Sequence, residues 1–319
     1  MKESKEVKKS YLRLFVTGFA MGTADLIPGV SGGTIAFLSG IYEELLKSIK
    51  LVTGDVLRLF FKLKFTEAIK LIPFRFLLPL VVGLFGAIFL LANVLSYLLS
   101  TYPVFVWAFF FGLVLASTRV VSKRVSNWGM IEIGGFVVAA IGAYILVGSV
   151  PVETPSSLLF FFLAGMIAIA AMILPGISGS FILLLLGKYQ QVLGAVTNRD
   201  FLTLIVFALG AVFGIALFSR VLTYLFAKHH NISVAILAGF MLGSVRKIWP
   251  WQEVVSTRIN SHGEEVPLIV NNVLPNNFDA NVILALALSL IGAGIVLYLG
   301  KLDLVKETEQ DLTKKQRVA

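Results

Sequence analysis

Long runs of apolar residues dominate this 319-residue chain and decide what it can fold into. Most of these runs approach the roughly 20 residues that a helix needs to cross about 30 Å of hydrocarbon. Hydrophobic residues make up 57% of the chain, whereas a soluble domain has about 45–50%. Because one soluble core cannot hold this excess, the sequence predicts an all-α polytopic membrane protein. The runs, free of acidic and basic side chains, are residues 76–99, 104–118, 133–150, 201–219, 232–245 and 280–300.

The composition also limits the chemistry that the chain can carry out. It has no Cys, which excludes disulfides, thiol nucleophiles and thiolate metal sites. Its three His residues, His229, His230 and His262, lie outside the apolar runs and offer little for a metal centre. We therefore expect no metal and no cofactor. The net charge of +9, without a nucleic-acid-binding motif, indicates contact with anionic membrane lipids rather than nucleic acid.

Two further apolar regions, residues 11–49 and 157–196, are interrupted in the middle by Pro and Gly. Each half of such a region has about 16–20 residues, and the shorter halves reach roughly 24 Å as helices. We expect a broken helical hairpin in each region, either re-entrant or crossing the membrane twice. In both cases the chain enters and leaves the membrane on the same side.

The distribution of basic residues predicts the orientation of the spans. With the N-terminus inside, alternation places 21 of the 27 Lys and Arg residues on the inner side and five outside, with Arg220 left in a span. The five outer residues are Lys188, Arg199, Arg246, Lys247 and Arg258. Inner loops of membrane proteins are enriched in Lys and Arg. We therefore predict that both termini are cytoplasmic. The N-terminal segment lacks a small-residue cleavage pattern and is expected to be retained.

Two connecting segments have their own character. Residues 50–75 are basic and amphipathic, so we expect them to lie along the inner membrane surface. Residues 249–279 are polar and begin with Trp249 and Trp251, which are typical anchors at a membrane interface. We expect this second segment to form an outer loop or lid.

The chain contains an internal repeat. At a shift of 147 residues, Leu-Ile-Pro-Gly-Val-Ser-Gly-Gly at 26–33 aligns with Ile-Leu-Pro-Gly-Ile-Ser-Gly-Ser at 173–180. At a shift of 127, Gly112 aligns with Gly239. One unit contains a hairpin and three spans, an odd number of crossings, so the second copy is predicted to be inverted. Inverted repeats with broken helices are a recurrent transporter design, which we favour over a duplication kept only for packing.

This repeat divides the chain near residue 150. The predicted first repeat, residues 1–150, contains the hairpin 11–49, the amphipathic segment 50–75 and spans 76–99, 104–121 and 129–150. The predicted second repeat, residues 151–319, contains the hairpin 157–196, spans 201–227, 232–248 and 280–300, and a cytoplasmic tail.

The two Pro-Gly-x-Ser-Gly turns have the chemistry of an anion site. After each turn, the second arm begins with free backbone N–H groups and the positive end of a helix dipole. Hydroxyl groups add further donors. The alternative is that Gly and Ser only allow the helices to cross closely. We expect an anionic substrate to be bound by Ser31, Gly32, Gly33 and Thr34 in the first turn and by Ser178, Gly179 and Ser180 in the second.

Acidic residues near the turns occur in one half only. Asp25 precedes the first turn, and its repeat mate is a methionine. Glu43 and Glu44 end the same hairpin, where the second copy has two Gln; a position at the membrane interface would also explain these two acids. An ionisable group at membrane depth is by default a functional hypothesis. We expect Asp25, together with Glu44, to couple transport to the movement of protons or of another ion.

Two arginines occupy matched positions near the ends of matched spans. Arg119 aligns with Arg246, and the predicted topology places one near each face of the membrane. Arg grips phosphate through several donors, so such a pair suits an amphiphilic anion that moves between the faces. Arg119 could instead be an inner-face anchor, but the positive-inside tendency does not account for Arg246.

The paired hairpins resemble the bacterial polyprenyl-phosphate transporter family, formerly a membrane family of unknown function. The resemblance rests on both turns, on Gly-Ile-Tyr-Glu-Glu-Leu-Leu at 40–46 and on Gly-Lys-Tyr-Gln-Gln at 187–191, and it covers about residues 11–300. It implies a plasma-membrane protein that returns undecaprenyl phosphate from the outer to the inner leaflet, recycling the carrier lipid of cell-envelope synthesis. It also implies that a proton or ion gradient drives the cycle.

An intramembrane serine hydrolase is the competing class of function. Gly-Val-Ser-Gly-Gly at 29–33, with Ser31 as the nucleophile, fits Gly-x-Ser-x-Gly, and its first four residues fit the Gly-x-Ser-Gly of intramembrane serine proteases. A serine nucleophile needs a base within hydrogen-bond reach, and no His lies in a predicted span. A pair with Lys188 is conceivable, but the topology places this lysine at the end of a hairpin arm. We therefore expect a transporter rather than an enzyme.

Overall fold

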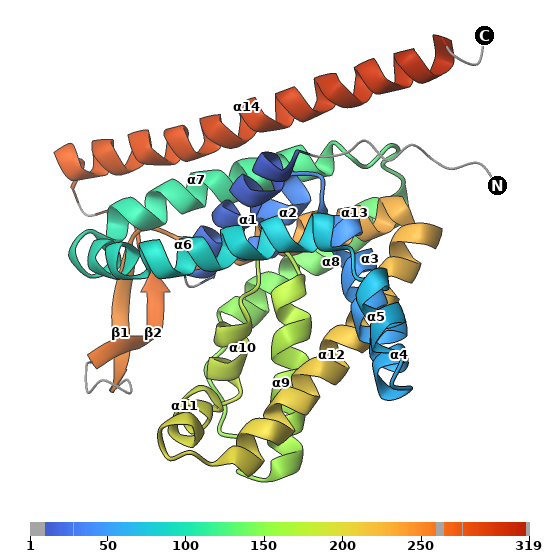
Figure 1. Cartoon of the computed structure of the whole chain (residues 1–319). Coiled ribbons are helices and arrows are strands. Elements are labelled where there is room, and N and C mark those ends of the chain that lie inside the picture. The colour runs from blue at the N-terminus through green and yellow to red at the C-terminus, as the bar shows by residue number, and fades with distance from the viewer. Residues whose placement is uncertain (1–9, 28, 260–264, 276, 317–319) are drawn as a thin grey trace.

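The computed structural model describes residues 10–27, 29–259, 265–275 and 277–316, with the side chains of 258–269 and 302–316 excepted. The first-turn proline Pro28 and the basic residues before Ser10 lie outside the described residues. The fold is built of helices and one two-stranded sheet (Figure 1). This confirms the prediction of a helical polytopic protein.

Within the described residues, six helices are long and apolar enough to cross a membrane, each at a predicted span. Many of their large apolar side chains are exposed, including Phe89 and Met130, as expected for surfaces that face lipid. The helices are α6 (Phe74–Thr101), α7 (Pro103–Ser122), α8 (Met130–Val147), α12 (Phe201–Lys228), α13 (His230–Ser244) with the 3₁₀ turn η2 (Val245–Ile248), and α14 (Ala280–Gln316).

Each predicted hairpin forms two helices joined by the Pro-Gly turn, and a bend then leads into a third helix. The first hairpin consists of α1 (Tyr11–Asp25), α2 (Gly32–Leu38) and α3 (Tyr42–Leu51). The second consists of α9 (Leu158–Ile173), α10 (Gly179–Leu185) and α11 (Tyr189–Thr197). With seven residues, α2 and α10 are each about 10 Å long, too short to cross a membrane alone.

Four glycines permit the turns and bends of the two hairpins. Gly29 and Gly176 lie in the Pro-Gly turns with φ of 86° and 90°, and Gly40 and Gly187 lie at the bends with φ of 67° and 64°. Residues with a side chain rarely adopt these angles. Because both pairs are 147 positions apart, the two halves use the same backbone conformation at the same places.

The most extensive helix packing also recurs between the halves. α1 packs against α6, and their repeat mates α9 and α12 pack against each other in the same way. The third spans cross over: α8 packs on α13 of the other half, and α14 packs along α7 (Figure 1). Each half thus holds the third span of the other.

Glycines bring the backbones of these helix pairs into direct contact. A Cβ atom on Gly18 would collide with the carbonyl oxygen of Leu80, and one on the matched Gly165 would collide with that of Phe207. At the crossed pairs, Gly112 approaches Ser289 and Gly239 approaches Phe136 in the same manner. Small residues at such contacts allow the close packing on which membrane helices depend.

The segment between the first hairpin and α6 is short-helical and exposed. It contains the π-helical turn η1 (Val52–Val56), α4 (Leu57–Phe61) and α5 (Phe65–Leu71). Phe60, Phe61 and Ile69 are among its exposed apolar side chains. The segment thus exposes both apolar and basic side chains, and its position along the inner membrane surface stays a prediction.

The segment after η2, predicted to be an outer loop or lid, contains the two strands of the fold. It forms an antiparallel hairpin of β1 (Gln252–Ile259) and β2 (Glu265–Asn272), in which Val254 pairs with Val270. β-Branched residues are frequent in both strands and favour extended backbone. The Trp249 ring nitrogen donates to the Val273 carbonyl at 2.8 Å and anchors the base of this hairpin.

Candidate functional site

Ser31 joins the two hairpins at the first Pro-Gly turn. It precedes α2, and its hydroxyl accepts a hydrogen bond from the Gly33 N–H at 3.1 Å. The same hydroxyl donates to the carbonyl oxygen of Met172, at the end of α9, at 3.2 Å. Because Ser31 is 1% exposed, these bonds form in a buried junction between the halves.

Asp25 occupies the anion position of the first turn. The chain reversal brings the last residue of α1 back to the start of α2, where the Asp25 carboxylate accepts a hydrogen bond from the Gly32 N–H at 2.7 Å. A Cβ atom on Gly32 would lie only 2.6 Å from this carboxylate. The first turn therefore holds an anion supplied by the protein itself.

The second turn has the same backbone without the acid. Ser178 precedes α10, and its hydroxyl lies 2.8 Å from that of Ser180. Ser178 and Gly179 are partly buried and Ser180 is exposed, whereas Ser31 and Thr34 of the first turn are buried. The Thr34 hydroxyl has no hydrogen-bond partner among the described residues. The two predicted anion sites thus differ: the first turn is closed around Asp25, and the second turn is more open.

Tyr42 forms a second link between the hairpins. Its hydroxyl donates to the carbonyl oxygen of Ile173 at 3.1 Å, one residue from the acceptor of Ser31. Its ring is buried against Phe37 and Phe226, at centroid distances of 5.0 and 5.7 Å. The aromatic cluster thus holds α3 where the Tyr42 hydroxyl reaches the end of α9.

Replacing Tyr42 with Phe is expected to lower the stability of the folded protein by about 1 kcal/mol, because the ring packing stays while the carbonyl of Ile173 loses its donor. The midpoint of thermal unfolding in detergent measures this loss. Tyr97→Phe, at an exposed position, is the control and should leave the midpoint unchanged. Equal midpoints for the two variants would show that the Tyr42 link contributes nothing.

A cavity of about 1510 Å³ opens where α2 bends into α3. Its lining includes the aromatic side chains of Phe37, Tyr42 and Phe226. It also includes basic and acidic side chains from segments far apart in the sequence. The Arg124 guanidinium donates to the Leu38 carbonyl at 3.2 Å and lies 5.5 Å from the ring centroid of Phe37. The charged lining residues are Glu43, Glu44, Lys47, Arg75, Lys123 and Arg124, and His230 also lines the cavity.

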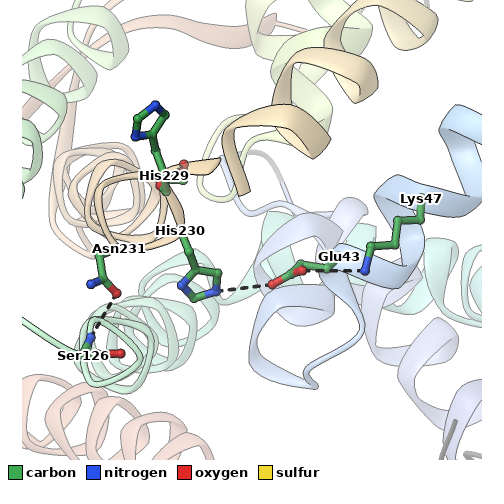
Figure 2. Close-up of polar contacts among 7 residues, drawn as sticks. Glu43, Lys47, Ser126, His229, His230 and Asn231 are labelled. Carbon is green, nitrogen blue, oxygen red and sulfur yellow. Dashed lines mark hydrogen bonds and ion pairs between the residues drawn. The ribbon is translucent and has the colours of Figure 1, made fainter. Parts of the chain in front are cut away.

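Figure 2 shows a polar contact between residues that line this cavity. The Glu43 carboxylate lies 3.3 Å from the His230 ring nitrogen and 3.9 Å from the Lys47 ammonium. His230 begins α13, so the contact joins α3 of the first hairpin to the second half of the chain. Glu44 lines the same cavity. Both acids predicted near the end of the hairpin therefore reach it.

The two predicted arginines lie near the ends of α7 and α13. Arg119 is exposed in the last turn of α7, four residues before the cavity residue Lys123. Arg246 lies in η2, where its guanidinium donates to the Tyr144 carbonyl at 3.1 Å and stacks on the Tyr144 ring at 4.4 Å. Since α13 carries His230 of the cavity at its start and η2 at its end, the cavity and Arg246 are about 24 Å apart along the helix.

Sequence reasoning missed two features of this region. The cavity lining is one, since it gathers basic side chains from several distant segments. The other is Lys247, placed on the outer side by the predicted topology, whose side chain packs on Gly29 of the first turn. The only signal for Lys247 in the sequence was its position directly after Arg246, which had been predicted as a site residue.

The hydrolase geometry is not formed around Ser31. Among the described residues, its hydroxyl bonds only to backbone groups, and no basic side chain reaches it. The Lys188 ammonium instead donates to the carbonyls of Thr154 and Pro155 and to the Gln191 side chain. The proposed base is therefore held elsewhere.

Comparisons with known proteins show which family the chain resembles. Residues 21–266 match the family described as undecaprenyl phosphate translocase-like. A polyprenyl-phosphate transporter from Vibrio cholerae is 40% identical over 298 residues, covering 92% of this chain and 97% of the relative. A polyprenyl-phosphate transporter from Staphylococcus aureus is 33% identical over 252 residues, covering 73% and 84%. No solved structure shows a significant match.

These names describe transporters rather than enzymes, in agreement with the prediction. With six apolar helices, the chain is a multi-pass membrane transporter. The family match spans both Pro-Gly turns, most of the cavity lining and η2. The chain therefore belongs to the undecaprenyl phosphate translocase-like family.

Proposed function

We propose that the protein moves polyprenyl phosphate, with undecaprenyl phosphate as the natural lipid, from the outer to the inner leaflet of the bacterial plasma membrane. The observation that carries the proposal is the junction of the two turns, where Ser31 donates to the Met172 carbonyl. In a chain related to polyprenyl-phosphate transporters, this junction puts two sets of N–H and O–H donors where a phosphate headgroup can be bound. The polyprenyl tail stays in the lipid.

The two halves are inverted in this proposal. The matched glycine contacts, the matched turns and the crossed third spans support one architecture used twice. With both termini in the cytoplasm, the cavity at the start of α13 faces inward and η2 faces outward. The structure then represents a state that is open to the inner side.

Asp25 couples protons to the binding of phosphate. Its carboxylate uses the Gly32 N–H that a phosphate would use, and two anions at one helix start repel each other. Protonation removes this repulsion and weakens the bond to Gly32, so phosphate can enter the first turn. The open second turn, with Ser178, Gly179 and Ser180, receives the phosphate first. Glu44, in the inner cavity, accepts the proton as the cycle ends.

The two arginines define the ends of the path. Arg246 captures the headgroup on the outer side after leaving the Tyr144 carbonyl, and Arg119 assists release beside the basic cavity on the inner side. A ligand shifts the balance between two states only through contacts that differ between them. Arg contacts that exist at one face at a time meet this requirement.

Movement of a short-chain polyprenyl phosphate in proteoliposomes with an imposed pH gradient tests the proposal. We expect gradient-dependent transport by the wild type and a loss of about tenfold in Arg246→Ala and Arg119→Ala, each lacking charge-assisted hydrogen bonds. Arg58→Ala, at an exposed position of α4, is the control and should transport normally. Absence of transport by the wild type would refute the function, whereas normal transport by both variants would refute only the arginine roles.

A further inference from the structure

Two lysines near the hairpins, Lys188 and Lys247, have sharply different surroundings. Lys188 is fully buried, and its ammonium donates at 3.1 Å to the Thr154 carbonyl and at 2.8 Å to both the Pro155 carbonyl and the Gln191 side chain. An ammonium group has three donors, so every one of them is satisfied. Lys188 is therefore a structural residue that ties the α10–α11 bend to the segment before α9.

Lys247 is partly buried but lacks such partners. Its ammonium lies 5.0 Å from the ring centroid of Phe181 in α10. Among the described residues, no carboxylate, carbonyl or hydroxyl accepts a hydrogen bond from it. A cation above an aromatic ring recovers only part of the hydration that burial removes. The ammonium group thus has three donors available for an anion.

The stem of Lys247 touches the first turn while its head reaches the second hairpin. Its Cγ lies 2.7 Å from the position of a Cβ on Gly29, so a side chain at Gly29 would displace it. Ser244, three residues earlier, lies against Gly176 of the second turn. The end of α13 and η2 therefore contact both Pro-Gly turns at once.

Lys247 and its neighbour Arg246 point to different partners. Arg246 is engaged with Tyr144 of α8, whereas Lys247 is directed at the turns. The Gln252 side chain donates to the Lys247 carbonyl at 3.0 Å and fixes the backbone at the start of the β-hairpin. The repeat mate of Lys247 is Val120, so this charge exists at one face only.

We infer that the Lys247 ammonium binds the phosphate of the transported lipid between the two Pro-Gly turns, on the side of η2. This assignment rests on the proposed function, because it takes a phosphate monoester as the ligand. Lysine is a common phosphate ligand that acts as a point charge, which suits a headgroup that must also leave. Free inorganic phosphate shares this chemistry, and the apolar Phe181 beside the ammonium favours the lipid.

Lys247→Met removes the charge and keeps the length of the side chain. We expect transport in proteoliposomes to fall on the order of 30-fold, as when one partner of a buried charge pair is removed. The thermal midpoint in detergent should stay equal or rise, because an unpaired ammonium is no longer buried. Lys188→Met is the matched control and should lower the midpoint, since it leaves three acceptors without a donor.

Ligand stabilisation separates the two sources of phosphate. A short-chain polyprenyl phosphate should raise the thermal midpoint of the wild type and not that of Lys247→Met, and inorganic phosphate at the same concentration should raise neither. An equal rise with inorganic phosphate would overturn the assignment to a lipid headgroup. An equal rise of wild type and Lys247→Met with the lipid would overturn the assignment to Lys247.

Lys247→Gln, neutral but polar, replaces the methionine variant if that variant does not fold. Wild-type transport by either folded neutral variant would overturn the inference while leaving the proposed function intact. Failure of the wild type to transport any polyprenyl phosphate would instead refute the proposed function. The two failures are therefore distinguishable in one set of proteoliposomes.

Discussion

Asp25→Asn is expected to abolish the response of transport to a proton gradient while the protein remains folded. The amide oxygen of Asn can still accept the hydrogen bond from the Gly32 N–H, but the side chain cannot take up a proton. The rate with an imposed gradient should therefore fall to the rate without one. For an imposed gradient of about one pH unit we expect this fall to be on the order of tenfold, because one unit changes the ratio of protonated to ionised carboxyl by that factor.

The same proteoliposome measurement, run with and without a pH gradient, gives both rates for each variant. Asp55→Asn is the matched control, because Asp55 is exposed in η1 and belongs to the same half of the chain. It should respond to the gradient as the wild type does. If Asp25→Asn responds equally well, protons are not taken up at Asp25, and the coupling group has to be sought elsewhere.

Alanine at Gly112 and at Gly239 is expected to destabilise the fold at both crossed helix pairs. The added methyl group would collide with the carbonyl oxygen of Ser289 in one case and of Phe136 in the other. Backbone oxygens cannot turn away as side chains can, so the helices must separate. Overpacking of this kind costs about 1–3 kcal/mol at each site, and the double variant should lose about the sum because the sites are separate.

The fraction of protein that elutes as a monodisperse species from detergent, measured after heating, reports this loss. Gly134→Ala and Gly142→Ala in α8 are the controls, because nothing lies within 4 Å of a Cβ at either position. These controls should be neutral or gain up to about 1 kcal/mol from the better helix propensity of Ala. Normal behaviour of Gly112→Ala would contradict the close contact of α7 with α14.

The six spans were predictable because uninterrupted apolar runs report directly on the length of a membrane helix. Their partners were not, since all faces of such helices are apolar and hydrophobic periodicity is lost. The glycines that select the partners, such as Gly112 and Gly239, are visible in the sequence but do not name the helix that they face. The β-hairpin was missed because its polar residues concealed the β-branched ones around Val254 and Val270.

At the candidate site, the turns themselves were predicted and their occupants were not. The motif shows that Gly32 starts a helix, but only the chain reversal shows that Asp25 returns to bind its N–H. Lys247 was counted among the basic residues on the outer side, and the count did not show that its stem packs on the first turn. Charge counting places a residue on a side of the membrane and says nothing about which neighbour its side chain contacts.

The glycine contacts between helices also determine how the molecule can move. Where backbone touches backbone, helices cannot slide or rotate against each other without separating, so we expect α1–α6, α9–α12, α7–α14 and α8–α13 each to move as a rigid body. Motion is then confined to the seams between these four bodies. The bonds of Ser31 and Tyr42 link α2 and α3, which belong to none of these four pairs, to the end of α9. The rate of a transport cycle would then depend on a few hydrogen bonds of this kind, which break and form again. The packing within each helix pair would stay unchanged throughout.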